Sequence, residues 1–345
     1  MAAFTSTILI TGGTTGLGYH TTLLLAQQFP SAKIIIASRT DKDNAADTLN
    51  KLVQKQQKSS KTSSFAQIEY LPLDLGSTSN IRTFVQNYAS RSYPPITALL
   101  LNAGLQYHSG DDLRLTPDGV ESTFGINHVG HALLFFLLKP HLAPNARIVI
   151  TSSGTHDPEQ KTTVPDAVYE SAELLAHPTD KDGYAKKSKG LQRYASSKLA
   201  NVLFTYALDR RLSTARETKN SSTTSWTVCT MMDPGLMPGT NLGRDFGPVV
   251  VWLFTHVAVH LVWLMRLLVG SQNVHLPQES AANLARLAGM RGEEAQRSAG
   301  KYFEGRTARN SSVVSMDEKK QEDLWRWTVE FLARDEEEKR AFETF

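Results

Sequence analysis

Short apolar runs alternate with longer amphipathic stretches along most of this chain. The apolar runs predict buried strands at 7–10, 33–37, 68–71, 98–101, 147–150 and 227–230. The amphipathic stretches between them predict helices, among them 19–29, 81–90, 119–139 and 194–212. Strands that alternate with helices in this way indicate a parallel sheet covered by helices on both faces. The pattern therefore predicts a single α/β domain over 1–345 with a doubly wound, Rossmann-type sheet.

A glycine-rich turn follows the first predicted strand. The sequence TGGTTGLG places Gly12, Gly16 and Gly18 directly before a predicted helix. Glycine permits a tight turn here and lets backbone N–H groups approach a pyrophosphate, which the helix N-terminus also favours. We therefore expect the half of the domain over 5–150 to bind a dinucleotide.

The end of the second strand bears on which dinucleotide is bound. An NAD(H)-binding protein usually carries an acid here for the ribose 2′-hydroxyl, but this chain has Ser38 and Arg39. Because an arginine accepts a 2′-phosphate, we expect NADP(H). Asp41 lies close by and leaves NAD(H) open.

Polar residues also follow the third, fourth and fifth strands. Asp74 follows the third, 102–104 (Asn-Ala-Gly) follow the fourth, and Ser152 and Ser153 follow the fifth. Asn127 stands within a predicted helix. Each is an ordinary turn or capping residue when taken singly. Because parallel strands present their carboxyl ends at one edge, the series predicts a single site there.

Tyr194 and Lys198 stand four residues apart in a predicted helix, so their side chains project from the same face. A free tyrosine has a pKa of about 10, and a fixed neighbouring cation lowers it. Such a pair also occurs by accident on helix surfaces, so the remaining motifs have to decide its meaning.

Taken together, these motifs resemble those of the short-chain dehydrogenases/reductases from Thr7 to at least Thr240. INHVGH, RIVITSS and YASSKLANVLF are most similar to the branch with retinol dehydrogenases and protochlorophyllide oxidoreductase-like proteins. The resemblance implies a catalytic tetrad of Asn127, Ser153, Tyr194 and Lys198. It also implies cofactor contacts from Thr11, Gly12, Thr14, Gly16, Leu17, Gly18, Ser38, Arg39, Asp74, Leu75, Asn102, Ala103, Gly104, Tyr194, Lys198, Pro234, Gly235 and Thr240.

The resemblance assigns a role to each catalytic residue. Lys198 would bind the nicotinamide ribose and lower the pKa of Tyr194, which gives a proton to a carbonyl oxygen as NADPH delivers hydride. Ser153 would hydrogen-bond that oxygen, and Asn127 would position a water that links Lys198 to solvent. Ser152 is a rival serine.

Two departures from the family pattern concern the chain around the tyrosine. Tyr194 follows Ser153 by 41 residues, which predicts an insertion over 155–190 beside the site. Tyr184, inside it, is a rival tyrosine, but its i+4 position holds serine. Cys229 is the only cysteine and lies in a predicted strand, which argues against the light-driven reductase chemistry of the branch and against an intrachain disulfide. We expect no metal site.

The composition points to a cytoplasmic enzyme. The net charge is +3 without a dense basic block, so nucleic acid is not expected as a partner, and the N-terminus lacks the pattern of a signal peptide.

We expect an NADPH-dependent reductase of a lipophilic ketone or aldehyde, or the reverse alcohol dehydrogenase. Two alternatives remain: a reductase of an activated C=C or C=N bond in secondary metabolism, and a catalytically silent NADP(H)-binding sensor or scaffold. The insertion would cover the helix through which relatives associate, which predicts a monomer.

The segment 248–269 is long and apolar enough to suggest a membrane span. A crossing would separate the helix expected near 277–288, and the strand expected near 301–304 at the sheet edge, from the rest of 191–345. As one helix, the segment would gather Thr255, His256, His260 and Arg266 on one face. We expect a hydrophobic lid, with peripheral membrane contact and an ordinary core helix as the alternatives.

Overall fold

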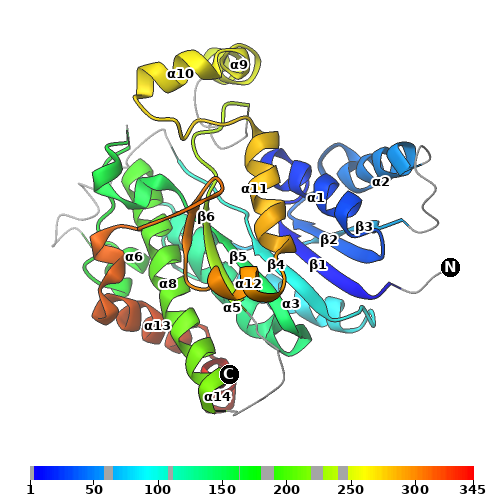
Figure 1. Ribbon diagram of the computed structural model, residues 1–345. Helices are drawn as coiled ribbons and strands as arrows, with labels where there is room; N and C mark the ends of the chain where they lie inside the picture. The colour runs from blue at the N-terminus through cyan, green and yellow to red at the C-terminus, as the bar shows by residue number, and fades with distance from the viewer. Residues whose placement is uncertain are drawn as a thin grey trace.

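The computed structural model describes residues 4–57, 65–107, 112–162, 164–179, 190–218, 228–239 and 248–345 (Figure 1). Its centre is an eight-stranded sheet with the order β3-β2-β1-β4-β5-β6-β7-β8. The neighbouring strands are parallel except for β8, which runs antiparallel to β7. The strands are β1 (Ser6–Thr11), β2 (Ala32–Ser38), β3 (Gln67–Pro72), β4 (Ile96–Leu101), β5 (Leu142–Thr151), β6 (Val228–Asp233), β7 (Tyr302–Glu304) and β8 (Thr307–Arg309).

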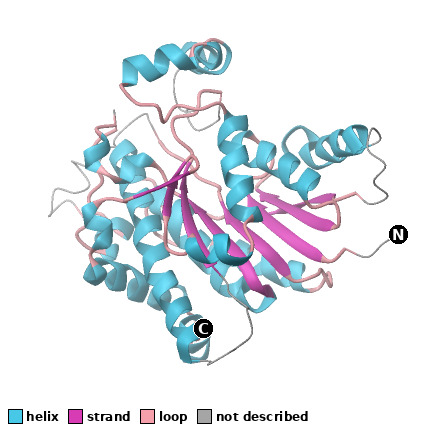
Figure 2. Ribbon diagram, viewed as in Figure 1, coloured by secondary structure: helices cyan, strands magenta, loops and turns pink. Residues whose placement is uncertain are grey.

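Helices cover both faces of this sheet (Figure 2). They are α1 (Gly16–Gln28), α2 (Ala45–Gln57), α3 (Thr78–Ala89), α4 (Ser122–Phe124), α5 (Gly130–Leu138), α6 (Ala172–Ala176), α8 (Gly190–Thr218), α9 (Pro248–His256), α10 (Val262–Val269), α11 (Pro277–Gly289), α12 (Gly292–Arg297), α13 (Glu318–Leu332) and α14 (Glu336–Glu343). The predicted doubly wound α/β fold is confirmed.

Two apolar layers hold the helices to the sheet. Successive side chains of a strand point to opposite faces. On β4, Leu99 and Leu101 therefore pack with α3, α5, α8 and α13, whereas Ala98 and Leu100 pack with α1, α2 and α11. Burial on both faces explains why the central strands are continuously apolar and stood out in the sequence.

The strand order places β1 between β2 and β4, so the chain winds outward in opposite directions on the two sides of β1. In open parallel sheets, ligands bind at the carboxyl ends of the strands where the order reverses. The glycine turn and the turn after β4 meet at this point.

The helix predicted over 119–139 is instead broken into α4, a π-helical turn over Gly125–Val129 and α5. Asn127 lies in the π turn. Single π turns occur often at functional sites because they reorient one side chain without ending the helix.

The strand expected near 301–304 forms as β7, but it is not the edge of the sheet. The unpredicted β8 pairs with it and takes the edge position. All three β8 side chains are exposed, so β8 has no buried apolar run by which it could be recognised.

The segment 248–269 is not one continuous helix. It folds as α9, a single turn over Ala258–His260, and α10, with a bend of 102° between the two arms. The shared polar face expected for one helix is therefore wrong. Among the described residues, no single helix has the length and apolar character to cross a membrane, and only this bent pair meets those criteria jointly. Figure 1 shows the pair standing apart from the sheet, beyond the start of α11.

The segment 155–190, which the sequence analysis expects to be an insertion, forms short elements beside α8. Its described part contains the single turns Gly154–His156 and Pro158–Gln160 and the helix α6. Helix α6 lies against α8 and α13. Tyr184 lies outside the described residues.

Candidate active site

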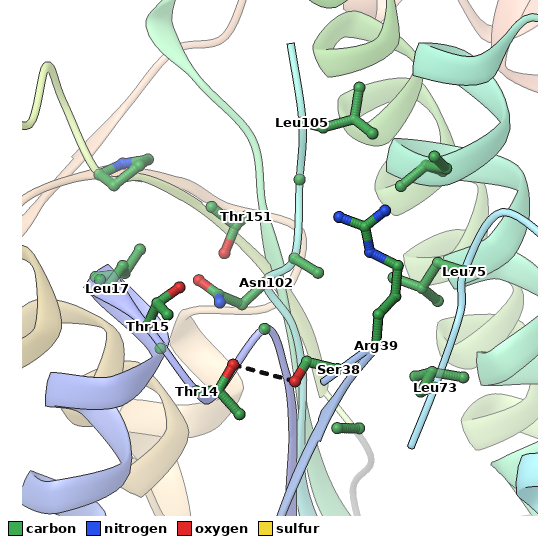
Figure 3. Close-up of a pocket in the computed structure, with 18 of the residues that line it drawn as sticks. Thr14, Thr15, Leu17, Ser38, Arg39, Leu73, Leu75, Asn102, Leu105 and Thr151 are labelled. Carbon is green, nitrogen blue, oxygen red and sulfur yellow. Dashed lines mark hydrogen bonds between the residues drawn. The ribbon is translucent and has the colours of Figure 1, made fainter. Parts of the chain in front are cut away.

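A cavity of about 310 Å³ opens at the carboxyl ends of β1, β2, β3 and β4 (Figure 3). Most of the residues expected to bind the cofactor line it, namely Gly12, Thr14, Gly16, Leu17, Gly18, Ser38, Arg39, Asp74, Leu75, Asn102, Ala103, Gly104, Tyr194, Lys198 and Pro234. Ser152, named above only as the rival serine, also lines it, and the sequence reasoning missed Thr15, Ala37, Thr40, Lys42, Leu73, Leu105, Ile126, Thr151 and Met237. Thr11 and Gly235 are not among the lining residues, and Thr240 lies outside the described part of the chain.

The glycine turn has a shape that side chains would prevent. Gly12 and Gly16 have φ angles of +69° and +53°, in the left-handed region that glycine adopts without strain. A Cβ on Gly18 would lie 2.2 Å from the carbonyl oxygen of Gly12. The turn therefore stays tight and leaves its backbone open at the N-terminus of α1, which fits a dinucleotide pyrophosphate.

Thr11 lies beneath the cavity and supports its wall. Its fully buried side chain accepts hydrogen bonds at 2.9 Å from the backbone N–H groups of Asn102 and Ala103. The Asn102 amide in turn donates to the Thr11 carbonyl oxygen at 2.8 Å. These bonds tie the turn after β4 to the end of β1, so Thr11 shapes the site from below.

The end of the cavity beside β2 is rich in hydroxyl and cationic groups. Thr14 Oγ1 lies 3.1 Å from Ser38 Oγ, and Figure 3 shows the Arg39 side chain reaching past Leu75 toward Leu105. Lys42 lines the same end. Asp41, the residue that left NAD(H) open, is absent from the lining residues and accepts a hydrogen bond from the N–H of Ala46 at 3.3 Å.

Tyr194 and Lys198 lie on α8 and are both buried at the cavity wall. The Lys198 Nζ atom lies 5.6 Å from the centre of the Tyr194 ring and donates to the Thr151 carbonyl oxygen at 3.1 Å. A Cβ on Gly104 would lie 3.4 Å from this nitrogen. Helical spacing thus placed the phenol and the ammonium group together, as the sequence predicted.

The two serines after β5 have different partners. The Ser153 side chain acts on the Tyr194 phenol and lowers its pKa. Ser152 donates to the Lys198 carbonyl oxygen at 2.9 Å and holds the backbone of α8. Of the two, Ser153 is therefore the serine whose hydroxyl group meets the phenol.

Asn127 ties the segment after β4 to α8. Its side-chain amide donates to the Leu105 carbonyl oxygen at 2.9 Å and to Ser197 Oγ at 3.0 Å, and its Oδ1 accepts from the Leu105 N–H at 2.9 Å. These bonds occupy both amide protons. The contact with a water that links Lys198 to solvent stays a prediction.

Burial dominates the protonation of the phenol and the amine. It raises the pKa of Tyr194, and Asp233 raises it further, although the hydrogen bond with Ser153 opposes them. Burial also lowers the pKa of Lys198 to about 8. Burial outweighs the effect that opposes it, and a lowering of the Tyr194 pKa by Lys198 stays a prediction. The phenol keeps its proton, which is the form that a proton donor needs.

The family follows from comparison with known proteins. The family model for short chain dehydrogenases matches residues 6–168. Human polyprenol dehydrogenase is 30% identical over 92% of this chain and 82% of its own length. The chain belongs to the short-chain dehydrogenase family.

Further relatives of this short-chain dehydrogenase differ in length. The chloroplastic short-chain dehydrogenase TIC 32 A of Brassica napus is 32% identical over 70% of the chain and 66% of its own length. The WW domain-containing oxidoreductase of Gallus gallus is 30% identical over 72% of the chain and 51% of its own length. The chain thus spans about half of that relative.

Solved structures share the fold of this short-chain dehydrogenase. NADPH-bound carbonyl reductase from chicken fatty liver has a TM-score of 0.54 and 17% identity, covering 89% of this chain and 99% of its own. The NAD complex of a 3-oxoacyl-[acyl-carrier protein] reductase from Brucella melitensis has a TM-score of 0.58 and 19% identity, covering 88% and 96%. The names of these two structures give NADPH in one and NAD in the other.

Proposed function

We propose that this enzyme reduces a ketone or aldehyde group of a lipophilic small molecule with NADPH, or oxidises the corresponding alcohol. The observation that carries the proposal is the Tyr194 phenol at the cofactor cavity, next to the Lys198 ammonium group and acted on by the Ser153 side chain. The bound nicotinamide supplies the hydride. The side chains of the chain supply the proton and the stabilisation of charge.

The protein residues act on the carbonyl oxygen. Tyr194 holds its proton because of burial and donates it to the oxygen as negative charge develops there. Ser153 donates a hydrogen bond to the same oxygen. Lys198 lies close enough to stabilise the resulting phenolate by its charge.

The preference for NADPH is inferred from the cavity end beside β2. Arg39 and Lys42 both line this end, and a 2′-phosphate carries negative charge that two cations stabilise. The carboxylate of Asp41 is engaged by the N–H of Ala46. These contacts support recognition of a phosphate more than of a ribose hydroxyl.

The lipophilic substrate is inferred from the helix pair α9–α10. Trp252, Trp263, Leu267 and Leu268 are 56%, 65%, 73% and 76% exposed. A Cβ on Gly239 would lie 2.9 Å from Val259, so the pair contacts the segment that leaves β6 past the cavity. Polyprenol dehydrogenase, a relative, is named for a lipid alcohol. We infer a lid over the substrate side, whose tryptophans also suit peripheral contact with a membrane surface.

We infer a monomer from the surroundings of α8. Helices α6 and α13 of the same chain pack against it. A second chain would have to displace them to reach the same surface. A stable dimer in light scattering at micromolar concentration would contradict this inference.

The oxidation of NADPH against a panel of substrates tests the proposal. The panel contains aldehydes and ketones of increasing chain length, matched enones and imines. We expect reduction of carbonyl groups, with the ratio kcat/KM rising with chain length. Turnover of enones or imines alone would favour the C=C or C=N alternative. Tight binding of NADPH without any turnover would favour the sensor or scaffold.

A further inference from the structure

His156 lies directly behind the catalytic serine and takes no part in the reaction described above. It ends the single turn Gly154–His156, and its side chain is fully buried. Its ring packs against the buried ring of Tyr302 on β7, with 4.8 Å between the ring centres. A buried imidazole needs hydrogen-bond partners, and both of its nitrogens have one.

The two partners fix the protonation of the ring. Nδ1 lies 2.8 Å from the carbonyl oxygen of Ser153, which can only accept a hydrogen bond. The backbone N–H of Ser312 donates to Nε2 at 3.1 Å. Because one partner accepts and the other donates, the ring is neutral and carries its proton on Nδ1.

These bonds join two distant turns of the chain. On one side, Ser153 contacts Tyr194 through its hydroxyl group and accepts from the Thr155 N–H at 3.4 Å. On the other side, Ser312 lies 156 residues further along and caps the turn Val313–Met316. The imidazole is thus a bridge between the turn that carries the catalytic hydroxyl group and the C-terminal part of the fold.

We propose that His156 is a positioning residue for carbonyl reduction, holding the Ser153 backbone through Nδ1–H and anchoring it to Ser312 through Nε2. This role rests on the proposed function, in which Ser153 acts on the reacting oxygen. Protonation of the ring would place a second N–H against the N–H of Ser312. The anchor is then lost, and the Ser153 hydroxyl group is no longer held beside the phenol.

The charges around the ring determine when this loss occurs. Burial lowers the pKa of His156, whereas Asp157 beside it and Asp233 on β6 oppose the decrease. The Tyr302 ring faces it from β7. The neutral form therefore prevails at pH 7, and turnover should fall only in acid, below the ordinary titration range of histidine.

Two substitutions separate the two hydrogen bonds. In His156→Asn, the amide nitrogen takes the place of Nδ1 and keeps the donor to Ser153. In His156→Gln, the longer amide reaches the place of Nε2 and keeps the acceptor for Ser312. We expect His156→Gln to lower kcat by about 10- to 100-fold, with the KM for NADPH within about 2-fold. His156→Asn lacks the anchor to Ser312 at every pH, so we expect its kcat at pH 7 to be lowered to a similar extent and its pH profile to lack the acid limb of the parent.

The measurements are kcat and KM for NADPH with a ketone of the panel between pH 4 and 8, and the melting temperature of each variant. A kcat within about 2-fold of the parent in both variants, or losses of kcat that follow the losses of melting temperature, would overturn the positioning role. So would an acid limb that persists in His156→Asn.

A spectroscopic measurement separates this inference from the proposed function. Selective ¹⁵N labelling of histidine, with His156→Asn to identify the signal, reports which ring nitrogen is protonated without any turnover. We expect protonation on Nδ1 at pH 7. Protonation on Nε2 would overturn the role of His156, whereas a parent enzyme that reduces no carbonyl would overturn the proposed function.

Discussion

Helix α8 and the pair α9–α10 are both rich in apolar side chains, yet their surroundings are opposite. On α8, even Lys198 and Asn201 are buried and hydrogen-bonded. On the pair, Trp263 and Leu268 are among the most exposed large apolar side chains that the structure describes. The buried helix holds each reacting group in one position by several partners. The exposed pair presents apolar surface to the solvent, and such surface is typical of a site that contacts another molecule.

The comparison predicts that removing one hydroxyl group from α8 abolishes turnover. Tyr194→Phe removes the proton donor but keeps the ring, so kcat should fall by about 10²- to 10⁴-fold. Binding of NADPH, measured by fluorescence, should change little. Tyr206→Phe is the matched control, because Tyr206 lies on the same helix and bonds to Ser311, away from the cavity. Turnover by Tyr194→Phe within a few-fold of the parent would contradict the mechanism.

The buried histidines in the layer beside α8 should also make the free energy of unfolding depend on pH. Burial lowers the pKa of His131 to about 4 and that of His128 to about 3. In the unfolded chain the same histidines bind protons near pH 6.5. The free energy of unfolding is therefore highest above that pH and decreases as the pH falls toward 4. At about 1.4 kcal/mol per pKa unit, we expect a loss of about 3 kcal/mol or more between pH 7 and 4.5 in urea titrations. His128→Leu should reduce this loss; an unchanged loss would show that other groups cause it.

The KM for NADPH should depend on the charge of one residue at the end of the cavity beside β2. Arg39→Ala should raise the KM for NADPH by about 10-fold or more, whereas the KM for NADH should change by less than about 2-fold. Lys42→Ala should have the same sign and a smaller effect. Equal changes for NADPH and NADH would show that Arg39 does not recognise the 2′-phosphate.

Substitutions in the exposed pair α9–α10 should have the smallest effect on kcat/KM, and only for long-chain substrates. Replacing Leu253, Leu267 and Leu268 with serine should leave the melting temperature within about 2 °C, because exposed side chains contribute little to folding. The ratio kcat/KM should fall several-fold for long-chain carbonyl compounds and stay unchanged for short ones. Binding to lipid vesicles in flotation should weaken in parallel. A fall for both substrate classes, with loss of stability, would mean that the pair is part of the core.

The buried strands and helices could be predicted from the sequence because apolar residues recur in them at the spacing of a strand or a helix. Strand β2, for example, carries an apolar run over 34–37, and the i, i+4 spacing alone placed Tyr194 beside Lys198. The site residues at the strand ends followed from the topology of a parallel sheet.

The remaining features depend on contacts that periodicity does not record. Gly125–Val129 forms a π turn although its residues suit an α-helix equally well. The break at Ala258–His260 lies in a run without glycine or proline after Pro248, so no residue of the usual helix-breaking type marks it. Lys42 and His156 are single polar residues whose partners lie elsewhere in the chain, Ser312 in the case of His156.

The segment that carries α9 and α10 leaves and rejoins the domain at one place. The N–H of Leu236 donates to the Asn273 carbonyl oxygen at 2.9 Å, and the N–H of His275 donates back to the Leu236 carbonyl oxygen at 3.0 Å. Helices α9 and α10 thus belong to a segment whose two ends are held together by these hydrogen bonds, between β6 and α11. In evolutionary terms, such a segment can be exchanged as a cassette. A lineage could acquire a new substrate range by replacing it while the hydride-transfer site stays as it is.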